Sequence, residues 1–256
     1  MKLSRFMEDA YQGTAPARRL KTQSKSLIFS LEDLADLVGS RPRREDVEQY
    51  VSEDRGQIEM LLSVPPARKH ALLWGYLSAL LAERSEGPLK LPGRDYAGLE
   101  MRRGWIVLEG AGSHLGEKMS GGRIIVQGSA GECLGQEMAG GGIIAAGCSD
   151  YAFRNMRAGF GLIRGDAGKF TGLGNRGGRI VVQGSCAERA GWLMHSGSLY
   201  VRGDAGEYLG LLMSGGRITV RGRAGRRAGW RKKGGMIAAA AFGPEAAEDV
   251  SKLQLV

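Results

Sequence analysis

The sequence has few of the residues on which disulfide networks, metal sites and membrane insertion depend. Its 256 residues include only 3 cysteines and 3 histidines, and no two cysteines form a Cys-x-x-Cys pair. This excludes a disulfide framework and is typical of a reducing cytosol. The sequence contains no run of about 18 uncharged apolar residues that would span a bilayer, and its N-terminus lacks the apolar segment of a secretory signal. We therefore expect a cytoplasmic protein with no membrane partner.

Proline is absent from residues 93–243, and acidic residues are absent between Glu207 and Glu245. Of the 42 glycines, 37 follow residue 92, whereas six of the 7 prolines precede residue 93. This shift predicts a boundary between an N-terminal arm and helical region, 1–92, and a second domain, 93–256. In the first region we expect an extended arm over 1–28 and a helix that Ser30 caps. A strongly apolar helix over 67–84 should be covered by the second domain or by a partner.

A repeat of 18 or 19 residues fills the second domain. Its units follow the pattern Gly-Gly-x-Ile-x-Val-x-Gly-x-Ala-Gly, as in GGRIIVQGSAG and GGRITVRGRAG. The first repeated position is occupied by Gly104, Gly122, Gly141, Gly159, Gly178, Gly197, Gly216 and Gly235. This period is too short for two helices or for a propeller blade, so each unit is expected to form one coil of a stacked solenoid.

Within each unit, apolar residues alternate with polar ones, as expected for a strand with one buried face. Ile180 and Val182 should point inward and Arg179 outward, and Cys186 takes an inward position that other units give to alanine. The repeated glycines, Gly178 among them, are expected at corners with positive φ. The predicted fold is mainly β: a single-stranded parallel β-helix of about eight coils, preceded by a small α-helical region.

The GG-x-I-x-V-x-G-x-AG pattern over 104–243 resembles the GXGXG β-helix family. That family includes the β-helical subunit of formylmethanofuran dehydrogenase, the related subunit of the formyltransferase/hydrolase complex, and the C-terminal domain of the large chain of glutamate synthase. The resemblance implies a right-handed β-helix without catalytic residues that supports subunits or domains where the chemistry takes place. The helical region before residue 93 lies outside the shared pattern.

The resemblance implies a non-catalytic scaffold subunit of a multi-subunit oxidoreductase of C1 metabolism, similar to the β-helical subunit of formylmethanofuran dehydrogenase. One alternative is a separately encoded β-helix domain of glutamate synthase, and another is a basic module that binds polyanions. No cofactor is expected on this chain; molybdenum or tungsten, iron–sulfur clusters or flavin would lie on partner subunits. The expected partners are catalytic subunits, with the N-terminal helices as a candidate contact for a homo-oligomer.

No catalytic, cofactor or metal residues are predicted. His70, His114 and His195 lie far apart in sequence without the spacing of a metal site. Cys133 and Cys148 occupy different positions of the repeat and should not converge. The glycine-rich strings lack the Gly-x-x-x-x-Gly-Lys-Ser/Thr pattern of a phosphate loop.

Two groups of surface residues are candidates for contact with a partner. The third coil, 141–158, is irregular: Arg154 stands where its third corner glycine is expected, with Tyr151 and Arg157 nearby, which fits either a coil one residue shorter or a contact surface. The second candidate is a basic end of the solenoid formed by Arg223, Arg226, Arg227, Lys232 and Lys233. Nucleic acid is not expected, because Trp230 is the one aromatic residue found among these cations.

Overall fold

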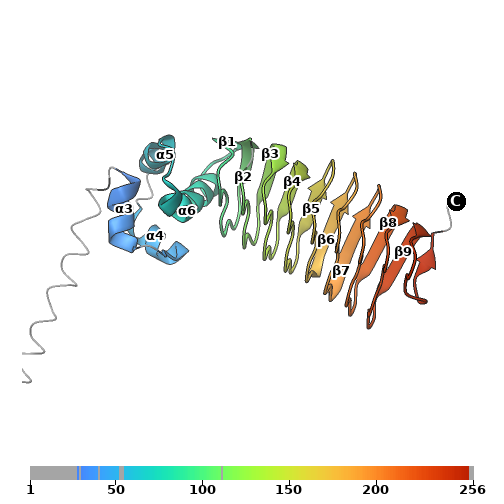
Figure 1. The fold of residues 1–256 in the computed structure, drawn as a ribbon. Coiled ribbons are helices and arrows are strands. Elements are labelled where there is room, and N and C mark those ends of the chain that lie inside the picture. Colours follow the sequence, from blue (N-terminus) through green and yellow to red (C-terminus); the bar gives the residue numbers. More distant parts are fainter. Residues whose placement is uncertain (1–27, 29, 40, 52–54, 111, 254–256) are drawn as a thin grey trace, which may run out of the picture. The chain divides into compact units, whose positions relative to one another are not determined.

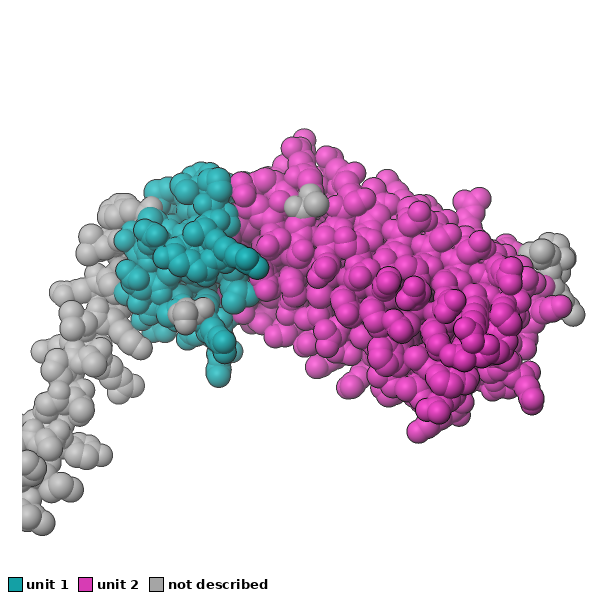
Figure 2. All heavy atoms as spheres, viewed as in Figure 1, with its two compact units in different colours: residues 1–73 teal, residues 74–256 magenta. Residues whose placement is uncertain are grey.

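The computed structural model describes residues 28, 30–39, 41–51, 55–110 and 112–253. It divides the chain into two compact units, 1–73 and 74–256 (Figure 2). The division falls earlier than the boundary expected at residue 92, because the helix that precedes the first strand groups with the solenoid. The predicted arm, 1–28, lies outside the described residues except for Ile28.

The first unit is helical, as its sequence predicts. It contains α3 (Leu31–Val38), α4 (Arg44–Tyr50), α5 (Arg55–Ser63) and the short 3-10 helix η2 (Arg68–His70). Ser30 caps α3 as expected: its Oγ accepts a hydrogen bond from Asp33 N at 3.1 Å, and the Asp33 carboxylate accepts one from Ser30 N at 2.9 Å. This reciprocal pair satisfies two amides that the helix itself leaves without acceptors.

The apolar helix α6 (Ala71–Glu83) continues into the second unit and covers the start of the solenoid. Ser78 Oγ accepts a hydrogen bond from Gly98 N at 2.9 Å, and Glu83 Oε1 accepts one from Arg102 N at 2.7 Å. Trp74 and Leu77 are fully buried. The prediction that this helix needs cover is confirmed, and part of that cover comes from the first coil.

The second unit is a parallel β-solenoid of about eight coils (Figure 1). Each strand pairs in parallel with the next one along the chain, so the sheet order equals the sequence order. The strands are β1 (Leu89–Pro92), β2 (Trp105–Glu109), β3 (Arg123–Ala130), β4 (Gly142–Cys148), β5 (Phe160–Ile163), β6 (Arg176–Val182), β7 (Ser196–Val201), β8 (Arg217–Ala224), β9 (Met236–Phe242) and β10 (Ser251–Lys252). The predicted fold class is confirmed.

Equivalent side chains of successive coils stack into columns inside the solenoid. Ile180 pairs with Gly161 of the coil before and Leu199 of the coil after, and Cys186 bridges Ala167 and Ala205 as predicted. A second inward column consists of fully buried methionines, interrupted once by Asn175: Met101, Met119, Met138, Met156, Met194 and Met213. These columns fill the interior with side chains of the protein itself.

The expectation for Gly178 is wrong. Most glycines of its repeat position have a positive φ, for example Gly197 at 80°, but Gly178 does not. The buried side chain of Asn175 changes this corner: its Oδ1 accepts a hydrogen bond from Gly178 N at 3.0 Å, and its Nδ2 donates one to Gly178 O at 2.9 Å. The strand β6 consequently begins early, at Arg176.

The irregular third coil is one residue shorter, and the missing residue lies near the end of its strand. Ser129 of β3 pairs with Gly147 of β4 after a register shift. Phe153, rather than Arg154, therefore takes the place of the corner glycine, with a φ of 57°. Its buried ring occupies the space above Gly161, where the other coils carry isoleucine or leucine. The third coil thus carries phenylalanine in place of the corner glycine, and the following coil carries Gly161 in place of isoleucine.

Candidate functional site

Buried side chains of the stacked columns occupy the solenoid interior, so we examine its surface for candidate sites. The three histidines are not brought together. His114 Nδ1 lies 2.6 Å from Glu117 Oε2, His195 Nδ1 lies 2.9 Å from Ser214 Oγ, and His70 belongs to the helical unit. Among the described residues, no three histidine, cysteine or acidic side chains are placed to hold a metal ion.

The cysteines are in the wrong environment for a nucleophile. Burial raises the pKa of the Cys148 thiol to about 12 and that of Cys186 further still. Burial and the neighbouring Glu132 carboxylate also raise the pKa of Cys133. A reactive cysteine requires the opposite shift, because the thiolate is the attacking species.

We therefore expect the native thiols to be nearly inert. A pKa of about 12 in place of 9.0 lowers the thiolate fraction of Cys148 about a thousandfold near neutral pH. An aromatic disulfide reagent should label the three cysteines only after guanidinium unfolds the chain. A thiol that reacts equally fast in the native and unfolded protein would contradict the expected protection.

The same pKa shifts make stability depend on pH. The free energy of unfolding should decline as the pH rises above about 9, because thiols of the unfolded chain ionise there and thiols of the folded chain do not.

Aromatic and arginine side chains form a continuous stack along one edge of the solenoid. Tyr151 lies on Phe170 with ring centroids 4.8 Å apart, and Arg189 lies between Phe170 and Tyr208, at 5.5 and 5.7 Å from their centroids. Arg227 follows at 5.6 Å from Tyr208. All five residues have a positive φ at the same corner of successive coils. We call them the arginine–aromatic column.

The column corrects the expectation that Trp230 is the one aromatic residue among the cations of the basic end, because Arg227 of that end also lies against Tyr208. Residues spaced by 18 or 19 positions look scattered in the sequence, but the coils bring them into contact. The ring faces of the column lie against each other or against guanidinium groups. Arg154, which is not part of the column, adds another such contact: its guanidinium carbon lies 5.9 Å from the centre of the Tyr151 ring. The column therefore stabilises the stack of coils more than it offers free faces to bases.

We predict that Arg189→Ala lowers the free energy of unfolding by about 1 kcal/mol, because it removes a cation from between two rings. The matched control is Arg202→Ala, since Arg202 is exposed and outside the column. Urea unfolding of both variants measures the difference. Equal stability of the two variants would mean that the stacking contributes nothing.

The predicted basic end has counter-ions within the chain. Glu245 accepts from Arg226 at 2.6 Å and from Arg227 at 2.6 Å, and these two hydrogen bonds lower the pKa of its carboxyl. Lys232 pairs with Asp249, and its side chain is only 4% exposed because it ends the methionine column. Of the predicted contact residues, five are exposed: Arg154, Arg157, Arg223, Arg226 and Lys233. The other three have intermediate exposure: Tyr151, Arg227 and Lys232.

The outer face of strands β2–β8 carries a second group of arginines, which differ from Arg226 and Arg227 of the basic end because they have no carboxylate partner among the described residues. Three rows of outward side chains cross these strands, and we call this surface the strand face. Its central row is apolar in five of seven coils and half-buried: Val107, Ile125, Ile144, Leu162, Val181, Tyr200 and Thr219. The outer rows hold six exposed arginines: Arg123, Arg179 and Arg217 on one side, and Arg164, Arg202 and Arg221 on the other. None of the six forms an ion pair with any described residue.

The strand face also contains a shallow hollow. It has a volume of about 440 Å³ and lies where Gly142 provides no side chain between Arg123 and Phe160. Position 142 has room, because a Cβ there would have only the Phe160 carbonyl oxygen within 4 Å, at 3.8 Å. Phe160 itself is 37% exposed beside the hollow. The hollow is open and apolar enough to receive a protruding side chain.

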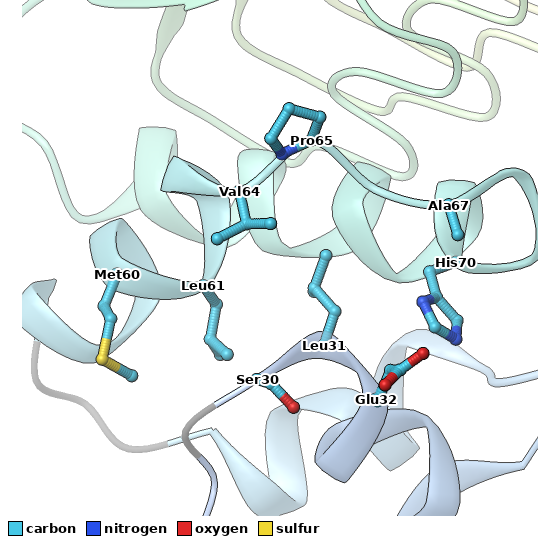
Figure 3. A pocket seen from close by; sticks show the side chains of 9 residues that line it. All are labelled: Ser30, Leu31, Glu32, Met60, Leu61, Val64, Pro65, Ala67 and His70. Carbon is cyan, nitrogen blue, oxygen red and sulfur yellow. The ribbon is translucent and has the colours of Figure 1, made fainter.

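The helical unit has a smaller hollow of about 260 Å³ (Figure 3). Apolar side chains from α3, α5 and the segment after α5 surround it, and Val64 is 61% exposed at its margin. Its volume is below the ~300–1,000 Å³ of typical ligand pockets. It suits one apolar side chain better than a cofactor.

No protein-family model and no curated protein matches the chain. Of the helices in the described ranges, none is long and apolar enough to cross a membrane.

Proposed function

We propose that the chain is a non-catalytic scaffold subunit of a cytoplasmic multi-subunit enzyme. The observation that carries the proposal is the strand face, where a mostly apolar row lies between two outer rows that hold three arginines each. These six arginines have no counter-ions in the described chain. The filled interior and the raised thiol pKa values agree with a role in binding rather than in chemistry. The repeat pattern resembles the GXGXG family, which favours an oxidoreductase of C1 metabolism similar to formylmethanofuran dehydrogenase. Molybdenum or tungsten, iron–sulfur clusters or flavin would then lie on partner subunits.

A second candidate function is binding of polyanions, which the excess of arginine on the strand face favours. A separately encoded glutamate synthase domain would have the same physical role as the scaffold, with a different set of partners. These proposals differ in what should accompany the protein in the cell: catalytic subunits for the scaffold, and nucleic acid or another polyanion for the basic module.

The test compares the recombinant chain with the protein purified from its natural source at low salt. We expect the recombinant chain to hold no stoichiometric metal or flavin and to have no turnover, and the natural preparation to elute with larger subunits. Metal analysis, absorbance spectra and native mass spectrometry provide the measurements. A stoichiometric cofactor on the lone chain, or a natural preparation that elutes at 27.4 kDa, would refute the scaffold role.

A further inference from the structure

The strand face has dimensions that match those of an α-helix. Adjacent coils are spaced by about 4.8 Å, so the six steps from β2 to β8 extend over about 29 Å, the length of a helix of about 19 residues. The two outer rows are four residues apart on each strand, or about 13 Å, which exceeds the ~10–12 Å diameter of a helix. A helix can therefore lie along the central row with arginines on both sides.

The charge of the strand face defines which helix would fit. Its outward positions include six arginines and one acid, Glu109. Two arginines make contacts within the face: Arg123 lies 5.5 Å from the centre of the Trp105 ring, and Arg221 Nε donates to Tyr200 Oη at 3.2 Å. Both contacts are to neutral side chains, so they orient the guanidinium groups without neutralising their charge. Carboxylates on both flanks of the occupant would complement these charges.

The shape of the strand face distinguishes a protein helix from other anionic partners. A nucleic acid or polysaccharide would leave the apolar central row against a hydrated, charged backbone. A membrane surface would meet the exposed arginines first, because the aliphatic side chains between them are half-buried. A helix with an apolar ridge can enter between the outer rows, so that the ridge covers the apolar central row while the flanks of the helix face the arginines. A large side chain on that ridge would fill the hollow at Gly142.

We infer that the strand face binds an acidic amphipathic helix of a partner protein, whose leucine-like ridge covers the central row and whose glutamates or aspartates pair with the arginine rows. The inference rests on the proposed scaffold role and specifies the chemistry of its partner. It also moves the main contact from the C-terminal basic end, where Arg226, Arg227 and Lys232 already have carboxylate partners, to the side of the solenoid.

The probe is a stapled helical peptide of about 19 residues with leucines at helical spacing and glutamates on both flanks. A matched peptide carries glutamine in place of every glutamate. In fluorescence anisotropy at about 50 mM salt, we expect the glutamate peptide to bind about tenfold more tightly, and this difference to shrink at about 500 mM salt. Heparin and phosphatidylglycerol vesicles serve as polyanion and membrane probes.

Charge-reversal variants locate the binding surface. Arg179→Glu with Arg202→Glu changes one arginine of each outer row, while the control Arg157→Glu with Lys233→Glu makes the same change of charge outside the strand face. We expect the first pair to weaken binding of the glutamate peptide about tenfold and the control to weaken it less than about threefold. Melting curves of both variants check that the solenoid is folded.

Three outcomes would overturn the inference: equal binding of the two peptides, equal losses in the two variants, or binding of heparin or vesicles without binding of the glutamate peptide. The last outcome would favour the polyanion module. The scaffold role is tested separately: if catalytic subunits co-purify while the peptide fails to bind, the scaffold docks its partners through another surface.

Discussion

The exchange Phe153→Gly with Gly161→Ile is expected to leave the solenoid nearly as stable as the natural protein, although each change alone should destabilise it severely. The double variant gives the third coil and the coil after it the residues that other pairs of coils have, as in Gly172 with Ile180. Phe153→Gly alone removes a fully buried ring, which should lower the free energy of unfolding by about 3–5 kcal/mol. Glycine adopts the positive φ of this position without strain, which should return about 1 kcal/mol of that loss.

Gly161→Ile alone fails for the opposite reason. Its Cβ would collide with ring carbons of Phe153, and that ring is enclosed on the other side, where it lies 2.7 Å from the position of a Cβ on Gly135. Urea unfolding of the two single variants and the double variant gives the coupling energy, which we expect to exceed about 2 kcal/mol. Additive effects would show that the two positions do not share one space.

The second prediction with a large expected effect compares the same substitution at two glycines that occupy the same position of the repeat, Gly197 and Gly178. Gly197→Ala should destabilise the protein by at least about 1–3 kcal/mol, because Gly197 has a φ of 80° and a Cβ there would collide with the backbone oxygen of Gly178. The nearest atoms to a Cβ at position 178 belong to the side chain of Met156, which can adjust, and the φ of Gly178 is not positive. Gly178→Ala should therefore cost less than Gly197→Ala.

A third substitution makes this comparison decisive. Met156→Ala removes a buried side chain and is costly by itself. It should cost less in the Gly178→Ala background than in the natural protein, because it vacates the space that the new Cβ enters. No side-chain change can rescue Gly197→Ala in the same way, since the obstacle is main chain. Thermal unfolding of the single and paired variants measures both effects. If Met156→Ala only adds to the loss in Gly178→Ala, the collision with Met156 is not the cause.

The repeat is sufficient to predict the solenoid because each coil buries its apolar face only against its neighbours. The inward place of Cys186 and the cap at Ser30 follow from local pattern alone, and both are confirmed. The glycine pattern places the irregular corner of the third coil one residue too far along, at Arg154, because a missing residue near the end of a strand leaves no mark in that pattern. The buried Asn175, which changes the corner at Gly178, carries no repeat signal either.

The surface is harder to predict than the core. A run of neighbouring cations near the C-terminus is prominent in the sequence, but its counter-ions, Glu245 and Asp249, come from the segment after the last repeat. Conversely, the arginines within each outer row of the strand face are separated by one or more whole coils and look dispersed. Their alternation with inward residues indicates their outward direction. That they lack counter-ions among the described residues becomes visible only when all coils are stacked.

The covering of the first coil by α6 has a consequence for self-assembly. A parallel β-solenoid is a template at both ends, because its terminal coil presents the same hydrogen-bonding groups that every internal coil offers to the next. Ser78 and Glu83 supply acceptors to Gly98 N and Arg102 N, which a preceding coil would otherwise provide. The helix thus occupies the N-terminal end of the solenoid, where a coil from another copy of the protein could otherwise pair and extend the stack into a fibril.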